Sequence, residues 1–176
     1  MRIRGKNRAL ALCIMLALPG TAEAKGEKGW DTASSIAAYG LTGVALGLPL
    51  TKGDTQGALQ AGGSVAASQL VTFGLKEAFP ELRPDGSDRK SFPSGHTSMA
   101  FAAAASLYNR EGPAAGIPAL AVATFVGVAR VQADKHHWYD CVAGAGIGAA
   151  SRFLITNKRD RTTAVIPWGD TKGGGL

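Results

Sequence analysis

Three long stretches without a charged residue constrain this chain most. They cover residues 32–51, 55–75 and 114–129 and are rich in alanine and glycine. None alternates apolar and polar residues as a half-buried strand does, and small residues let helices pack closely. With two further helical segments expected at 94–108 and 138–156, the sequence predicts an all-α fold, a compact bundle of about five helices.

The breaks between these helices are polar. Residues 52–54 and 109–113 carry charges and glycine, and a loop at 80–93 holds most of the local charge together with prolines that stop helices. A short polar connection at 130–137 precedes the last helix. Pro118 is a candidate kink within the fourth helix.

The N-terminus reads as an export signal. Four basic residues precede an apolar core at 9–18, and Ala22-Glu-Ala24 offers a small-residue cleavage site. We therefore expect a signal peptide at 1–24, a helical domain at 25–157 and a polar flexible tail at 158–176. A retained anchor is the alternative, although an apolar core of about ten residues is short of the ~20 needed to span a bilayer.

Whether the bundle crosses a membrane is left open by the sequence. The three uncharged runs approach the spanning length but are only modestly hydrophobic, and the helix expected at 94–108 is too short to cross unaided. If residue 25 starts outside the cytoplasm, the loops at 76–93 and 130–137 also lie outside. Both readings place the protein in a bacterial cell envelope, in the inner membrane or the periplasm, with its site facing the periplasm.

The net charge of +6 and the pI near 9.6 limit the class of partner. A basic chain can bind nucleic acid, anionic lipid or a phosphorylated substrate. The sequence has no basic stripe with interleaved aromatics and no zinc-finger spacing, so nucleic acid is not expected. Removal of the signal would leave Cys141 as a single cysteine, which excludes an internal disulfide.

Cations and a helix start form the first candidate site. Lys76, Arg83 and Arg130 lie at or beside the ends of apolar helices, and their side chains match phosphate oxygens. Ser94 and Gly95 open a helix, where backbone N–H groups and the helix dipole favour an anion. Taken singly, each cation could instead be a snorkelling or capping residue.

The histidines indicate a functional site more specifically than the cations do. His136 precedes Asp140 by four residues, a spacing that lets a carboxylate hold Nδ1–H and leave Nε2 as a nucleophile. His96 can then protonate a leaving oxygen. A zinc site built from the histidines with Asp134 and Asp140 is the rival, but the mature chain lacks an HExxH or paired-cysteine pattern, so no metal is expected.

These clusters resemble the signature of the type 2 phosphatidic acid phosphatase superfamily. They read Lys76-x6-Arg83-Pro84, then Pro93-Ser94-Gly95-His96, then Arg130-x5-His136-x3-Asp140, over about residues 57–155. Ala129 departs from the pattern, because the family usually has serine there as a secondary phosphate contact.

The resemblance implies a role for each residue. His136 attacks phosphorus, Asp140 orients it, and His96 protonates the leaving oxygen and later activates water. The phosphate would be held by five residues: Lys76, Arg83, Ser94, Gly95 and Arg130. His137 has no implied role and is expected to pack or to stabilise a loop.

The expected function is therefore metal-independent and cofactor-free hydrolysis of a phosphomonoester or pyrophosphate, through a phosphohistidine, at one end of the bundle. The expected partner is a phosphorylated lipid or a small phosphate ester, and membrane association is expected. A soluble periplasmic acid phosphatase, a vanadium haloperoxidase and a non-catalytic phospholipid-binding protein remain as alternatives. Nothing in the sequence indicates the oligomeric state.

Overall fold

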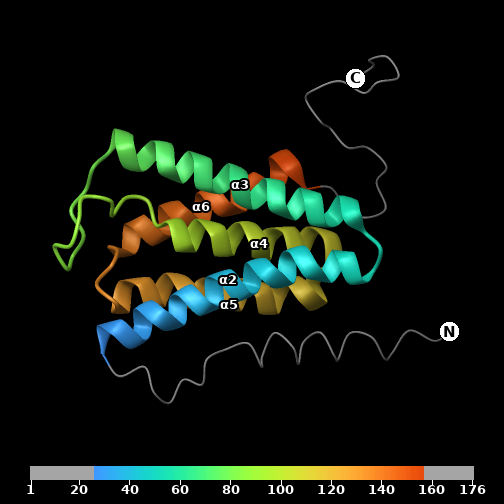
Figure 1. The fold of residues 1–176 in the computed structure, drawn as a ribbon, viewed down its shortest axis with the longest axis horizontal. Coiled ribbons are helices and arrows are strands. Elements are labelled where there is room, and N and C mark those ends of the chain that lie inside the picture. The colour runs from blue at the N-terminus through green and yellow to red at the C-terminus, as the bar shows by residue number, and fades with distance from the viewer. Residues whose placement is uncertain (1–25, 157–176) are drawn as a thin grey trace.

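The computed structural model describes residues 26–156, which fold into five helices (Figure 1). They are α2 (Glu27–Thr51), α3 (Thr55–Ala78), α4 (Gly95–Glu111), α5 (Pro113–Gln132) and α6 (Trp138–Ile155). Over this range there is no strand, and one isolated bridge pairs Glu81 with Lys90. The prediction of an all-α bundle is confirmed. The expected signal peptide at 1–24 and tail at 158–176 lie outside the described residues.

Several helices are longer than the uncharged runs that predicted them. Helix α2 begins at Glu27 rather than at residue 32, and α5 continues through Pro118 to Gln132 rather than stopping at residue 129. Charged residues extend these helices because they find partners: Asp31 of α2 pairs with Arg130 of α5. A run without charges therefore marks the buried middle of a helix and not its ends.

The break predicted at 109–113 was placed too early. Helix α4 runs on to Glu111, because Arg110 forms a 2.6 Å ion pair with Asp54 at the start of α3. The helix ends at Gly112, whose φ of 81° lies in the left-handed region that glycine tolerates, and whose N–H donates to the Tyr108 carbonyl.

Helix α4 is the central element, packed against each of the other four helices (Figure 1). Five of its nine buried residues are alanine, and residues from α2 and α5 pack around this face. The fully or nearly fully buried side chains of this helix include Ala100, Ala102, Ala103, Ala104, Ala105 and Leu107. Small side chains here allow short distances between helix axes.

Two glycines let α6 lie directly against α4. A Cβ at Gly148 would stand 2.2 Å from the Ser98 carbonyl oxygen, and one at Gly144 would stand 2.5 Å from the Ser94 carbonyl oxygen. Any larger residue would push the two helices apart. This close approach matters for function because it fixes the start of α6 beside the start of α4.

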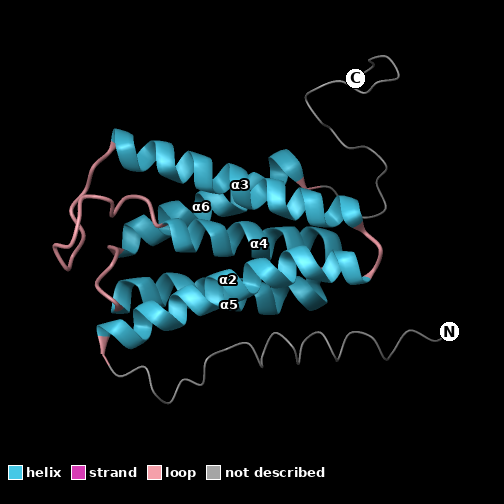
Figure 2. Ribbon diagram, viewed as in Figure 1, coloured by secondary structure: helices cyan, strands magenta, loops and turns pink. Residues whose placement is uncertain are grey.

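The two ends of the bundle differ in construction (Figure 2). One end has the tight turns at residues 52–54 and at Gly112. The other end gathers the start of α2, the long loop at 79–94 and the connection at 133–137. All the residues singled out by the sequence lie at this second end, which we call the site end.

Two of the described helices are long and apolar enough to cross a membrane, judged by length and composition. They are α2 and α5, and 39 % and 44 % of their apolar windows are buried inside the bundle. Both therefore serve the core as well. Of the three runs considered from the sequence, α3 is the one that does not qualify within the described residues, because its composition is rich in glycine, serine and glutamine.

Candidate active site

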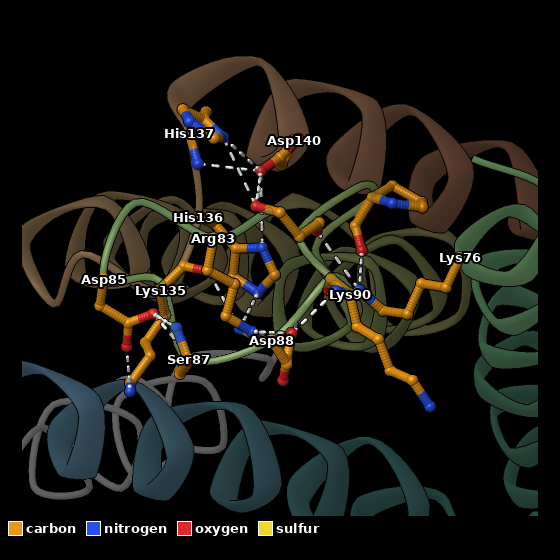
Figure 3. A network of polar contacts seen from close by, with 12 residues as sticks. Lys76, Arg83, Asp85, Ser87, Asp88, Lys90, Lys135, His136, His137 and Asp140 are labelled. Atoms are coloured by element: carbon orange, nitrogen blue, oxygen red, sulfur yellow. Dashed lines mark hydrogen bonds and ion pairs between the residues drawn. The ribbon is translucent and has the colours of Figure 1, made fainter. Parts of the chain in front are cut away.

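His136 lies at the centre of the site end (Figure 3). It sits just before α6 and is only 2 % exposed. Its Nε2 is 3.3 Å from Nη1 of Arg83, and its Nδ1 faces Oδ2 of Asp140 at 3.7 Å. Because Arg83 can only donate, Nε2 must be an acceptor and Nδ1 must carry the proton. The nitrogen with the lone pair is thus the one that faces the cations.

Asp140 is held from two sides by the chain around it. Its Oδ2 accepts from the Ser91 hydroxyl at 2.5 Å and from the His137 backbone N–H at 2.8 Å, the second of which caps α6. Burial alone would raise the pKa of Asp140, but the His136 ring, Ser91 and the His137 N–H lower it below its ordinary value. The carboxylate is therefore fixed as an anion beside the imidazole.

The contact from Asp140 to His136 predicted by their spacing is present but long. At 3.7 Å it is an ion-pair distance and not a hydrogen bond. Nδ1 of His136 and Oδ1 of Asp140 are both buried and have no hydrogen-bond partner among the described residues. The spacing of His136 and Asp140 therefore brings the two side chains together without a hydrogen bond between them.

His96 enters the same site from the start of α4. Its Nε2 lies 3.2 Å from the Ser35 hydroxyl, and the Tyr39 ring meets it edge-on at 5.8 Å. Burial lowers the pKa of His96 to about 4, and the charges of Arg130 and His136 add to the shift. The pKa of His96 therefore responds to positive charge on Arg130 and His136.

Burial also lowers the pKa of His136 to about 4. Asp140 opposes this shift, whereas Arg130, Arg83 and Lys76 reinforce it. Both imidazoles are accordingly neutral at pH 7. A neutral ring is the required form of a nucleophile.

The three predicted cations all lie at the site end, each held differently, and Arg130 in the last turn of α5 pairs with Asp31. Lys76 donates to the backbone carbonyls of residues 90, 91 and 93, at 2.6, 3.3 and 2.6 Å. Arg83 donates to Asp88 at 2.7 Å and to the Lys135 carbonyl at 2.9 Å. The ammonium of Lys76 thus holds the loop that precedes α4. Its positive charge also lowers the pKa of His136.

Ser94 and Gly95 occupy the start of α4 as expected, but with different contacts. The Ser94 hydroxyl is buried against the Thr97 hydroxyl at 2.9 Å and makes no side-chain cap. Its backbone N–H donates to the Asp140 carbonyl at 3.0 Å, which ties α4 to α6. Gly95 is the first helical residue, beside the Gln69 amide.

His137 contacts its neighbours in the way expected of a loop-stabilising residue. Its ring stacks on Tyr139 with centroids 5.0 Å apart, and its Nδ1 is 3.6 Å from Glu81 and 3.4 Å from Asp140. Glu81, His137 and Asp140 bring potential metal ligands within 4.8 Å of one another. However, Oδ2 of Asp140 already accepts two hydrogen bonds there, which leaves it poorly suited to a cation.

Sequence reasoning missed several polar residues that contact this site, including Ser91 and three residues at the start of α2. Ser91 lay in the loop expected at 80–93 without a role of its own, and its hydroxyl donates to Asp140. Three others lie at the start of α2, a segment judged only by its lack of charge: Asp31, Ser34 and Ser35. The one signal available was Asp31, the last charged residue before a long uncharged run, and its partner on another helix cannot be identified from that alone.

This fold and this set of residues define a family. The chain belongs to the PAP2 superfamily, whose family model matches residues 57–163. The resemblance inferred from the three motifs is thereby confirmed.

Particular relatives agree with that membership. Over 76 residues the chain is 38 % identical to a lipid A 1-phosphatase of Porphyromonas gingivalis, covering 42 % of this chain and 17 % of the relative. Over 111 residues it is 31 % identical to a lipid A 4'-phosphatase of Helicobacter pylori, covering 54 % and 56 %. A lipid phosphate phosphatase 1 of Arabidopsis thaliana is 45 % identical over 74 residues, covering 34 % and 22 %. The chain thus spans about half or less of these relatives.

A solved structure shows the same fold. The crystal structure of Aquifex aeolicus LpxE superposes with a TM-score of 0.60 at 22 % identity, covering 86 % of this chain and 94 % of that one. The helical arrangement around the site is therefore that of a known architecture.

Proposed function

We propose that this chain is a phosphatase that removes phosphate from a lipid through a phosphohistidine on His136. The observation that supports this most is the setting of the His136 ring, with Asp140 on its Nδ1 side and Arg83 on its Nε2 side. A buried neutral imidazole so oriented has its lone pair directed at the place where an anion would bind.

The first step forms a bond from Nε2 of His136 to phosphorus and breaks the bond from phosphorus to the leaving oxygen. The electron pair of the broken bond goes to that oxygen, and His96 supplies its proton. Asp140 stabilises the positive charge that develops on the His136 ring. Arg83 and Arg130 oppose the charge on the phosphoryl oxygens.

The second step returns the enzyme to its starting state. His96, now neutral, takes a proton from water as the water oxygen attacks phosphorus. The bond from phosphorus to Nε2 breaks, its electron pair returns to the ring, and inorganic phosphate leaves. Both steps use the same nucleophile and the same acid–base group, and together they consume one water and release the leaving alcohol and inorganic phosphate.

Independence from metal is part of the proposal. Three cationic side chains at one site supply the charge neutralisation that a divalent ion gives in other phosphatases: Lys76, Arg83 and Arg130. The purified protein should hydrolyse a generic aryl phosphate in EDTA and be inhibited by vanadate. Loss of activity on chelation, restored by one divalent metal, would contradict this part of the proposal.

A lipid substrate is supported by the relatives' names and by the surface of the site end. Large apolar side chains are exposed on the loop after α3 and at the start of α6, with Phe79, Leu82 and Trp138 exposed at 58 %, 51 % and 68 %. Exposed aromatic and aliphatic side chains beside a phosphate site suit acyl chains and an interfacial position. We place the protein in the bacterial envelope with this end facing the periplasm.

The test of the lipid assignment is a panel of phosphorylated lipids and water-soluble phosphate esters, assayed together in detergent micelles. The proposal expects higher kcat/KM for the lipids. Equal values for both groups would instead support a non-specific phosphatase.

A further inference from the structure

Helix α2 supplies part of the site although it lies outside the family match. The family model begins at residue 57, whereas α2 ends at Thr51. Even so, Asp31, Ser34 and Ser35 share one face of this helix, three and four residues apart, and contact the site. None of these three residues belongs to the motifs identified from the sequence.

The principal contact is with the guanidinium of Arg130. That side chain is 5 % exposed, and its Nη1 pairs with Oδ1 of Asp31 and lies 3.4 Å from the Ser34 hydroxyl. Its Nε is buried and has no hydrogen-bond partner among the described residues. The guanidinium is thus held through Nη1, and its buried Nε–H can still donate to an acceptor.

We propose that Asp31 is a positioning residue that holds Arg130 by Nη1 so that its Nε–H edge is presented to a phosphate oxygen. This rests on the proposed function. A guanidinium has a rigid donor fork, so fixing one nitrogen fixes the direction of the others. A buried N–H donor without an acceptor is costly, and an arriving phosphate oxygen relieves that cost.

The geometry favours this role over direct competition between Asp31 and phosphate. The carboxylate engages Nη1 and leaves Nε without a partner, so the donor that we assign to phosphate is not occupied by Asp31. The Asp31 side chain is 40 % exposed, which places it at the edge of the site and not at its centre next to His136. A competing anion would bind the edge that phosphate needs.

The test measures anion binding and needs no turnover. Calorimetric titration of the full chain with inorganic vanadate should show about tenfold weaker binding for Asp31→Asn, the scale of one charged hydrogen bond. KM for an aryl phosphate should rise with it. In an Arg130→Ala background the same substitution should change vanadate affinity no further, because its effect passes through Arg130.

A matched control lies at the opposite end of the bundle. Asp54→Asn also weakens a buried pair of aspartate and arginine, with Arg110, but should leave vanadate affinity at the wild-type value whatever it does to Tm. If Asp31→Asn does not fold, Asp31→Glu retains the charge while displacing the carboxylate, and the same dependence on Arg130 is expected.

The outcomes separate this inference from the proposed function. Unchanged affinity in Asp31→Asn, or a loss that persists without Arg130, would overturn the positioning role, and tighter binding would show that Asp31 competes with the anion. A wild-type chain that neither binds vanadate nor turns over substrate would instead overturn the proposed function itself.

Discussion

At the scale of single residues, the site depends on two imidazoles that burial keeps neutral. His136 can attack only as the neutral ring, and His96 can protonate only as the charged one. Burial lowers the pKa of both to about 4. Bound substrate must therefore raise the pKa of His96. A phosphate dianion does this to a nearby histidine because it attracts the protonated ring.

The first prediction concerns their removal. His136→Ala and His96→Ala should each lower turnover by at least ~100-fold, the usual scale for losing a catalytic proton-transfer group or nucleophile. His137→Ala is the matched control, since its ring packs on Tyr139, and it should cost far less. Steady-state rates on an aryl phosphate decide this, and near-wild-type turnover in either of the first two variants would refute that residue's role.

The second prediction concerns pH. Above its pKa, the protonated fraction of His96 in the free enzyme falls about tenfold per unit, so kcat/KM should fall as pH rises from 5 to 8. Below pH 4, protonation of His136 should remove the nucleophile. The profile of His96→Ala on the same substrate accounts for the substrate's own titration. A wild-type profile that rises toward pH 8 is incompatible with an acid role for His96.

At the scale of helices, the site is held by the contact between α4 and α6. Their close approach at Gly144 and Gly148 places Asp140 beside Ser94, so the carboxylate beside His136 and the start of α4 form one rigid unit. A site built on helix starts is more precise than one carried by loops alone.

The third prediction tests this packing. Gly148→Ala places a methyl group against the Ser98 carbonyl and should lower the free energy of unfolding by about 1–3 kcal/mol. Gly146→Ala is the control on the same helix: nothing lies within 4 Å of the added methyl, so it should leave stability unchanged or raise it. Denaturant melts in detergent would show the difference, and equal stabilities would contradict the packing account.

Predictions about the helices succeeded where the pattern was local in sequence. They failed where a contact with a distant residue determined the helix end or the role of a side chain. The three uncharged runs predicted α2, α3 and α5, and the motifs predicted that His136, His96 and the cations share one end of the bundle. The extension of α4 to Glu111 needed Asp54, more than fifty residues away. The role of Asp31 needed Arg130, a contact between α2 and α5 that no spacing rule encodes.

At the scale of the whole molecule, a polar reaction centre is built into one end of an apolar bundle. The large apolar side chains exposed on α3 and α6 include Leu70, Phe73, Val142, Phe153 and Leu154. Together with two helices of spanning length, this surface favours contact with lipid over water.

The fourth prediction follows from that surface. The expressed protein should stay with the membrane fraction after carbonate extraction and should require detergent for release. A soluble periplasmic enzyme of the same family would instead be released by osmotic shock. Fractionation followed by detection of an epitope tag distinguishes these outcomes without any assay of activity.

The central claim is that phosphate passes through a covalent bond to Nε2 of His136. Acid lability distinguishes phosphohistidine from phosphoserine, so enzyme mixed with labelled substrate should be quenched in alkali within milliseconds and analysed by peptide mass spectrometry. The account predicts an acid-labile, alkali-stable label on the peptide containing His136, absent from His136→Ala and prolonged in His96→Ala. Turnover without any label on that peptide, or a label on another residue, would contradict it.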